Sequence, residues 1–161
     1  MREFSIIQNH ALGALAIQSF AKEYYKQNKG QSGVIFPLIM PLLPIVFNER
    51  ACGSLNEVKR ITQTRFLTTL SDYRDIPAGL QSRMVDMADQ TFKSLNLAFS
   101  LNLIIYQAEK GEIMPVRYSK KKIPALQYKD NQEILYASKV LGNWFAQYSI
   151  EEICISLNIV F

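Results

Sequence analysis

Histidine and cysteine are scarce in this chain of 161 residues, and each shortage excludes a class of function. His10 is the only histidine, which rules out metal sites built from several imidazoles. Two cysteines, Cys52 and Cys154, form neither a disulfide framework nor a metal-binding spacing. The sequence also lacks the GxxxxGK[ST] motif of a phosphate-binding loop, so we do not expect it to bind ATP by itself. We predict no cofactor and no metal.

Neither His10 nor Cys52 has the neighbours that catalysis needs. A general base must reach the group that it deprotonates, and no partner base or nucleophile pattern accompanies His10. Cys52, in the stretch RACGS, resembles a nucleophile loop, but a reactive thiolate needs an electropositive and accessible setting. We therefore predict that His10 caps or packs a helix, that Cys52 is a buried reduced thiol, and that the chain is not an enzyme.

The length and charge of the chain fit one soluble domain over residues 1–161. A chain of this length can bury a sizeable core without disulfides. Its formal net charge of +4 is mildly basic, which is compatible with a surface that faces phosphate. Arg2 is the only early basic residue, and no clear cleavage site follows it, so we expect no secretory signal and a cytosolic protein.

The most informative stretch is Val34–Phe47, which reads VIFPLIMPLLPIVF and carries no charge. It is shorter than the about 20 residues that a membrane-spanning helix needs, so we expect no membrane span. Its three prolines each remove a helix hydrogen bond and cannot donate to a strand ladder. We predict a bent apolar segment that is buried either in the chain's own core or against a partner.

Helical periodicity with capping residues predicts a mostly helical chain. The first helix, 10–28, is expected to start after the N-cap Asn9 and to end before Gly30. Its first half is rich in glycine and alanine, so another element can approach it closely. Further helices are expected at 54–70, 78–99, 130–148 and after Ser149. The helix at 78–99 has a continuous apolar repeat of 3.6 residues, which places Leu80, Phe92 and Leu95 among its inward-facing residues.

The later helices have recognisable start signals. Capping boxes, in which a serine and a glutamate three residues later satisfy helix N–H groups, are predicted at Ser54 and Ser149. Asp75 to Pro77 marks the start of the helix at 78, because proline suits the first helical turn. Asp130 or Asn131 is the expected cap of the helix at 130.

A β-branched and aromatic stretch predicts a β-hairpin over 102–117, with its turn at Glu109 to Gly111. The fold class is thus mostly α with one β-hairpin, a compact α+β domain. Its parts are an N-terminal helix and apolar segment (1–50), a middle part (54–118) and a C-terminal helical pair (130–161). The order of helices and hairpin in the middle part permits a winged helix-turn-helix, in which a helix enters the major groove of DNA.

One positive cluster follows the hairpin. Its members are Arg117, Lys120, Lys121, Lys122 and Lys129. These side chains are candidates for phosphate contacts with DNA, which would be independent of base sequence and sensitive to salt. The alternative is an ordinary solvated loop, which is the usual state of a short charge run.

Three segments resemble one family. They are NHALGALAIQSFAKEYY at 9–25, FPLIMPLLPIVFNERACGSL at 36–55 and ASKVLGNWFAQYSIEEICISLNIVF at 137–161. Their order and spacing are similar to the middle component of bacterial three-component ABC systems, a group that overlaps Lamassu-type anti-phage defence. Residues 56–136 match only in pattern. The chain departs from the family at His10, where proline is frequent, and in the final LNIVF.

The resemblance implies a small non-catalytic subunit beside an SMC/Rad50-like ABC ATPase and an effector, often a nuclease. It implies no catalytic residues. An adaptor that binds two partners needs exposed apolar surface, and the proline-rich segment and the Trp144 region are candidates. The expected partner-facing residues are Phe36, Leu38, Met40, Leu42, Leu43, Trp144 and Phe145.

The family resemblance and the order of helices and hairpin thus lead to two different functional hypotheses. The first is an adaptor that links the ABC ATPase to the effector in anti-phage or anti-plasmid defence, with DNA contacted directly or through the complex. The alternative is a winged-helix transcriptional regulator, whose affinity for DNA would fall steeply with salt.

Overall fold

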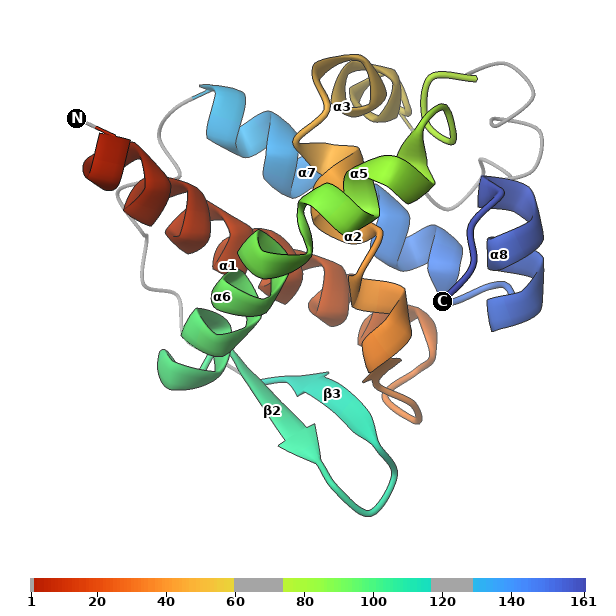
Figure 1. The fold of residues 1–161 in the computed structure, drawn as a ribbon. Coiled ribbons are helices and arrows are strands. Elements are labelled where there is room, and N and C mark those ends of the chain that lie inside the picture. Colours follow the sequence, from red (N-terminus) through yellow and green to blue (C-terminus); the bar gives the residue numbers. More distant parts are fainter. Residues whose placement is uncertain (1, 60–73, 117–128) are drawn as a thin grey trace.

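The structure is a computed structural model that describes the fold of residues 2–59, 74–116 and 129–161, and the side chains of these residues except 2–8 and Lys129. Figure 1 shows the order of the elements along the chain. The first half holds α1 (Arg2–Gln27), β1 (Val34–Ile35), the 3-10 helix η1 (Phe36–Ile39), α2 (Leu42–Val46) and α3 (Glu49–Asn56). The second half holds α5 (Leu80–Asp86), α6 (Ala88–Ser100), β2 (Ile104–Gln107), β3 (Glu112–Pro115), α7 (Lys129–Phe145) and α8 (Ile150–Leu157).

Helix α1 is the centre of the packing, since α6 and α7 both lie against it. Two glycines allow this close approach. A Cβ atom on Gly13 would lie 2.3 Å from Ser94 Oγ of α6, and one on Gly142 would lie 2.4 Å from the Phe20 carbonyl oxygen of α1. The prediction that α1 has a thin face for close packing is therefore confirmed.

The ends of α1 only partly follow the prediction. Its start at Asn9 is wrong, because the helix begins at Arg2 and passes through Asn9. A residue that favours the N-cap position does not stop a helix when the residues before it are also good helix formers. At the other end, Gly30 adopts the expected left-handed conformation (φ +73°), and its N–H donates to the Tyr25 carbonyl at 2.9 Å.

The proline-rich segment forms short elements that tolerate proline. Pro37 lies in the first turn of η1, Pro41 precedes α2 as its N-cap, and Pro44 lies in the first turn of α2. These positions do not need an N–H group for the helix, so proline costs little there. The segment thereby bends within a few residues. Its side chains from Leu42 to Val46 are all buried in the chain's own core.

The predicted helix at 54–70 starts earlier. Asn48 caps α3, and its side chain accepts a hydrogen bond from the Ala51 N–H at 3.0 Å. Ser54 lies inside the helix, where its hydroxyl donates to the Arg50 carbonyl at 3.0 Å. The predicted capping box at Ser54 is therefore wrong, because the earlier cap had already begun the helix. Residues 60–70 of this prediction lie outside the described part of the chain.

The predicted helix at 78–99 is two helices, α5 and α6, separated by a break at Met87 (φ −101°, ψ 8°). The predicted start after Pro77 is also displaced, because Gly79 adopts a left-handed conformation and precedes α5. Leu80 and Leu95 are buried as the helical period predicts. Phe92, expected to face inward with them, is 45% exposed. The buried face of α6 is made by Thr91, Ser94, Leu95 and Ala98, so Phe92 lies beside this face rather than on it.

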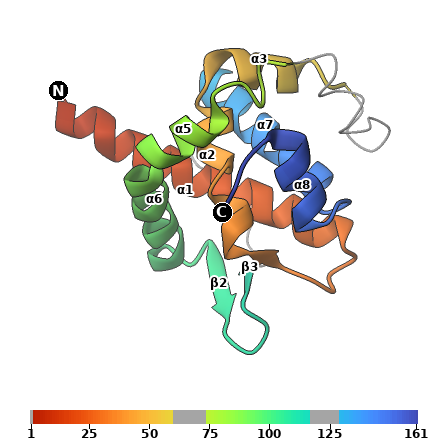
Figure 2. The ribbon, with the colours of Figure 1, turned by 45° about the vertical axis from the view of Figure 1, so that its right-hand side comes forward.

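The predicted hairpin is confirmed as β2 and β3, joined by a turn in which Gly111 has φ +65°. It is part of a three-stranded antiparallel sheet of order β1-β3-β2, in which Val34 pairs with Ile113. The strand β1 was not predicted. Because proline cannot donate to a strand ladder, the sequence argues against a central strand in this segment, and β1 is instead an edge strand that ends before Pro37. Figures 1 and 2 show the hairpin projecting from the end of α6 away from the helices.

The C-terminal helical pair is confirmed, although α7 ends at Phe145 and not at 148 as predicted. Asp130 lies in the first turn of α7 rather than before it. The capping box of α8 is complete, since Ser149 Oγ accepts from the Glu152 N–H at 3.2 Å and Glu152 Oε2 accepts from the Ser149 N–H at 3.0 Å. No helix in the described residues is long and apolar enough to cross a membrane.

A buried polar contact fixes α7 on α1. Asn143 is fully buried, and its Nδ2 donates to Gln27 Oε1 at 3.1 Å and to Glu23 Oε1 at 3.4 Å. Its Oδ1 accepts from Gln147 Nε2 at 2.7 Å. Because an unpaired amide in this position would be costly, these bonds favour one register of the two helices.

Candidate functional site

The two candidate catalytic side chains lie apart from any assembled site. His10 is half-buried on α1. Cys52 is buried in α3, and its loss of solvent, together with the nearby Glu133 carboxylate, raises the pKa of the thiol to about 11. Such a thiol is almost entirely protonated at neutral pH and is a poor nucleophile. In the three described ranges, no cluster of three or more histidine, cysteine or acidic side chains could hold a metal ion.

Five of the seven expected partner-facing residues belong to the core. They are Leu38, Leu42, Leu43, Trp144 and Phe145, which are at most 2% exposed. Phe145, for example, meets Phe20 of α1 edge to face, with ring centroids 5.5 Å apart. A partner could reach these five side chains only if the chain opened. We therefore assign them to the chain's own core, which is the first of the two fates predicted for the apolar segment.

Phe36 and Met40 differ from the other five, because both reach the surface. The basic cluster cannot be placed in the same way. Arg117 and Lys120 to Lys122 lie outside the described residues. Lys129 is the first residue of α7, and its side chain is not described. The proposed phosphate contacts therefore stay a prediction from the sequence.

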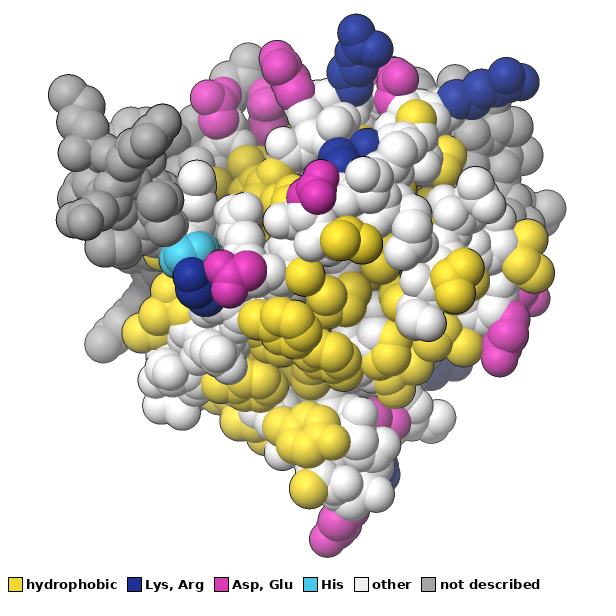
Figure 3. All heavy atoms as spheres, in the orientation of Figure 1, with side chains coloured by type: hydrophobic (Ala, Val, Ile, Leu, Met, Phe, Trp, Pro, Cys, Tyr) yellow, Lys and Arg dark blue, Asp and Glu magenta, His cyan; other side chains and the backbone are white. Residues whose placement is uncertain are grey.

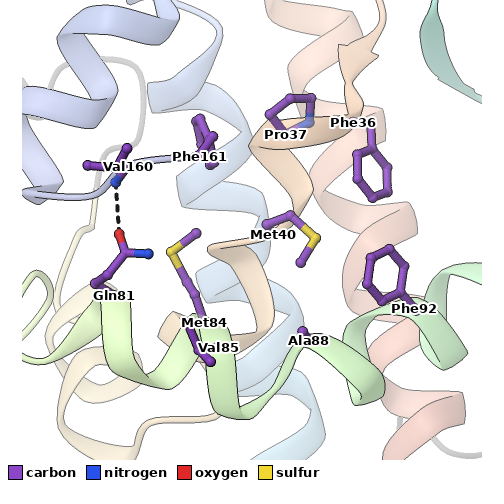
Figure 4. Close-up of a pocket in the computed structure, with 10 residues that line it drawn as sticks. All are labelled: Phe36, Pro37, Met40, Gln81, Met84, Val85, Ala88, Phe92, Val160 and Phe161. Atoms are coloured by element: carbon purple, nitrogen blue, oxygen red, sulfur yellow. Dashed lines mark hydrogen bonds between the residues drawn. The ribbon is translucent and has the colours of Figure 1, made fainter.

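Phe36 and Met40 line a groove of about 420 Å³ between η1, α5, the start of α6 and the residues that follow α8. Figure 4 shows side chains from these four segments turned toward one another. The lining residues are Phe36, Pro37, Met40, Gln81, Met84, Val85, Ala88, Phe92, Val160 and Phe161. None of these side chains carries a charge. We call this feature the apolar groove.

The apolar groove has a buried floor and an exposed rim. Met84 is buried at the floor, whereas Val85 on the rim is 69% exposed. At one end, the rings of Phe36 and Phe92 stack with centroids 5.8 Å apart and an interplanar angle of 19°. Methionine side chains adapt to different neighbours, so Met40 and Met84 can fit a partner of irregular shape.

Two polar contacts position the walls. The Val160 N–H donates to Gln81 Oε1 at 2.8 Å, which holds the residues after α8 against α5 (Figure 4). Arg83, on α5, donates from Nε to the Pro44 carbonyl at 3.1 Å and so ties α5 to α2. Burial lowers the pKa of the Arg83 guanidinium. These two contacts hold the backbone of the groove walls in place.

The apolar surface extends beyond the groove. Figure 3 shows hydrophobic side chains spread over the middle of this face and onto the projecting hairpin. Exposed large hydrophobic residues include Val85, Phe92, Val160 and Phe161 of the groove lining and Ile105 and Tyr106 of β2. Contiguous exposed apolar patches on soluble proteins usually mark sites of interaction with other proteins or ligands. The arrangement is suited to binding rather than to proton transfer.

Sequence reasoning missed most of the apolar groove for a physical reason. The lining comes from segments that are distant in the chain, and no local pattern announces that they meet. The only available signal was the helical repeat of residues 80–99, which assigned Phe92 to the core. The expectation of partner-facing residues at Phe36 and Met40 does coincide with the groove.

The chain thus combines a helical core, a small three-stranded sheet and a groove lined by uncharged side chains. The model of one protein family, ABC-three component (ABC-3C) system Middle Component 3, matches residues 1–161. The chain therefore belongs to this family of middle components. No curated protein and no solved structure matches the chain.

Proposed function

We propose that this middle component is a non-catalytic adaptor in the cytosol that links an SMC/Rad50-like ABC ATPase to an effector such as a nuclease. In this proposal, the system acts in anti-phage or anti-plasmid defence of the Lamassu type, and DNA is contacted directly or through the complex. Family membership supports the role of a component among other components. The proposal that the chain is not an enzyme rests on the sequence, which assembles no acid, base and nucleophile.

The observation that carries the proposal is the apolar groove. A face that exposes Val85, Phe92 and Phe161 without a nearby charge in the lining is costly to leave in water. In the complex, we expect apolar side chains of another component to fill the groove and to cover its rim. Its volume of about 420 Å³ is enough for a few large side chains, which is the usual scale of an interface hot spot.

Co-purification tests this proposal. The tagged chain is co-expressed with the other components of its ABC system, and the recovered proteins are identified by mass spectrometry. We expect both the ATPase and the effector to be recovered. Val85→Glu places a charge on the groove rim and should reduce recovery of at least one component by about tenfold or more, because a charge buried without a partner is strongly unfavourable.

Ile155→Glu is the matched control. Ile155 lies on α8, is 82% exposed and takes no part in the groove, so the same charge there should leave recovery unchanged. Equal loss with both variants would show that the effect is not specific to the groove. Recovery of the wild-type chain by itself would contradict the adaptor proposal.

The alternative of a winged-helix regulator is not favoured by the described residues. Helix α6 precedes the hairpin, so in a winged-helix protein it would be the helix that enters the major groove of DNA. The one basic side chain of α6 is Lys93, which forms an ion pair with Asp89 at 2.8 Å, and the neighbouring Phe92 is stacked on Phe36. Binding to DNA phosphates relies on lysine and arginine side chains, which this helix does not supply in number.

A further inference from the structure

Two hydroxyl groups on α6 are buried without a hydrogen bond. Thr91 and Ser94 are both fully buried, and neither Thr91 Oγ1 nor Ser94 Oγ has a hydrogen-bond partner within the described residues. Both belong to the buried face of α6, and this helix packs against α1. Ser94 lies at the contact itself, because a Cβ atom on Gly13 of α1 would be 2.3 Å from its Oγ. A hydroxyl that loses water and gains no partner is unfavourable, so these two groups weaken the docking of α6.

Two buried polar side chains of α7 differ from these, because they have partners. Ser138 is as fully buried as Ser94, but its hydroxyl donates to the Ile134 carbonyl at 2.8 Å. The Asn143 amide, also fully buried, donates to Gln27 Oε1 of α1 at 3.1 Å. Helices α6 and α7 thus pack on the same central helix, one with two unpaired hydroxyls and the other with hydrogen-bonded polar groups.

The apolar side chains that the two helices bury also differ in size. The buried residues of α6 are Thr91, Ser94, Leu95 and Ala98. Those of α7 include the large side chains Leu141, Trp144 and Phe145. Hydrophobic stabilisation grows with the apolar area removed from water, and an aromatic side chain buries much more area than an alanine. Helix α6 is therefore held in the fold less strongly than α7.

Helix α6 also contributes to one wall of the apolar groove. Its residue Phe92 lines the groove, and the Phe92 ring stacks on Phe36 of η1 (Figure 4). Phe36 is anchored to the core by the buried Leu38 and Ile39 of the same short helix. The break at Met87 separates α6 from α5, so the two helices are not one rigid rod. A displacement of α6 from α1 would therefore break the stack of Phe92 on Phe36 and change the shape of that end of the groove.

We propose that α6 opens from α1 while α7 and the rest of the core stay folded, and that this opening reshapes the apolar groove at Phe36 and Phe92. In the open state, water satisfies the hydroxyls of Thr91 and Ser94, which offsets part of the apolar contact that is lost. Elements with little buried apolar surface commonly open at a lower free energy than the whole domain. The inference concerns the free chain, so it goes beyond the adaptor proposal and does not depend on it.

Hydrogen exchange of the free chain, followed by mass spectrometry, measures this opening. An undocked helix of 13 residues is only marginally stable in water, so the amides of α6 exchange once it leaves α1. In the wild-type chain, we expect peptide 88–100 to have protection factors at least about tenfold lower than those of peptide 134–145. Thr91→Val and Ser94→Ala each remove an unpaired hydroxyl and favour the closed position. Each should raise the protection of peptide 88–100 by about fivefold or more.

Each substitution has a matched control. Ser138→Ala makes the same chemical change as Ser94→Ala at a hydrogen-bonded serine of α7, which stays docked when α6 opens, so protection of peptide 88–100 should stay within about twofold. Phe36→Ala tests the link to the groove. It removes the stack on Phe92 and should lower the protection of peptide 88–100 by about threefold. Val85→Ala, which also lies in the groove lining but on α5, should leave it unchanged. Circular dichroism checks that every variant is folded.

Three results would overturn the inference. Equal protection of peptides 88–100 and 134–145 in the wild-type chain would mean that α6 opens only when the whole chain unfolds. Thr91→Val and Ser94→Ala that protect α6 no more than Ser138→Ala does would mean that the unpaired hydroxyls do not favour opening. Unchanged protection with Phe36→Ala would overturn the link between α6 and the groove. None of these measurements needs a partner, so a failure of co-purification overturns the adaptor proposal and leaves this inference in place.

Discussion

The part Leu42–Val46 of the proline-rich segment and the walls of the apolar groove are both rich in hydrophobic residues, yet the chain covers only the first. Leu42, Leu43 and Ile45 are fully buried, whereas Val85 and Val160 are mostly exposed. The proline-rich segment is apolar on every side, so any fold that leaves it in solvent loses much hydrophobic stabilisation. The groove walls are amphipathic, and each contributes only a few apolar side chains to the surface.

The difference teaches that a long apolar run is weak evidence for a partner surface. Such a run is the first part of a chain to be drawn into its core. An exposed apolar surface arises instead where helices end or break, as at Met87 between α5 and α6, and where short stretches from distant segments meet. The following experiments test whether the two regions differ in this way.

The largest effect is expected in the proline-rich segment. Leu42→Ala removes a fully buried side chain and leaves a cavity, which should lower the free energy of unfolding by about 2–5 kcal/mol. Phe36→Ala, in the same segment but at the surface, should lower it by less than about 1 kcal/mol. Urea denaturation followed by circular dichroism measures both. If the two losses were equal, the division into core and surface within this segment would be wrong.

The next effect concerns the contact between α1 and α7. Gly142→Ala forces a methyl group to within 2.4 Å of the Phe20 carbonyl oxygen, and the helices must separate to admit it. We expect a loss of about 1–3 kcal/mol in the free energy of unfolding. Gly53→Ala is the matched control in α3, where a Cβ atom meets nothing within 4 Å. It should stabilise the chain by about 0.5–1 kcal/mol, because alanine favours the helix.

A smaller effect on stability is expected at the groove rim. Val85→Glu changes a mostly exposed side chain, so the free energy of unfolding should stay within about 0.5 kcal/mol of the wild-type value. Binding of an apolar fluorescent dye to the native chain should fall, since the variant places a charge beside the groove. A marked loss of stability would mean that Val85 contributes to the core, which would remove the contrast between the two regions.

The smallest effect is a difference in thiol chemistry between core and surface. Burial raises the pKa of Cys52 from 9.0 to about 11, so at pH 8 its thiolate is roughly a hundredfold scarcer than in an ordinary cysteine. Iodoacetamide should therefore modify the more accessible Cys154 first, as peptide mass spectrometry would show. Alkylation of Cys52 should accelerate as the pH rises from 9 toward 11. Early modification of Cys52 at pH 8 would contradict its buried setting.

The same pKa has a defined effect on stability. Because the pKa of Cys52 is higher in the folded chain, the unfolded chain loses this proton at lower pH. The thiol's contribution is thus fully present below pH 9 and is lost as the pH rises toward 11. Comparison of urea midpoints for the wild-type chain and Cys52→Ala at pH 8 and pH 10 isolates this contribution, and the difference between them should shrink at the higher pH.

Local signals in the sequence predicted those elements whose cause is local. The hairpin at β2 and β3, the left-handed Gly30 and the capping box at Ser149 depend on a few adjacent residues, and all three are confirmed. Predictions failed where two local signals competed. The N-cap of α3 is Asn48, so the later cap signal at Ser54 lies inside the helix. In the same way, α1 begins at Arg2, so the cap signal at Asn9 lies inside it.

The sequence by itself determined that this chain is mostly helical with one hairpin, and that most of the segment 34–47 is buried, because periodicity, capping and hydrophobicity are properties of neighbouring residues. Only the tertiary structure decided what buries that segment, and that Phe36, Met84, Phe92 and Phe161 line one groove. It also decided that the three-stranded sheet has the order β1-β3-β2, with a strand from the proline-rich segment paired to the hairpin. These outcomes depend on contacts between residues far apart in the chain, which no local pattern encodes.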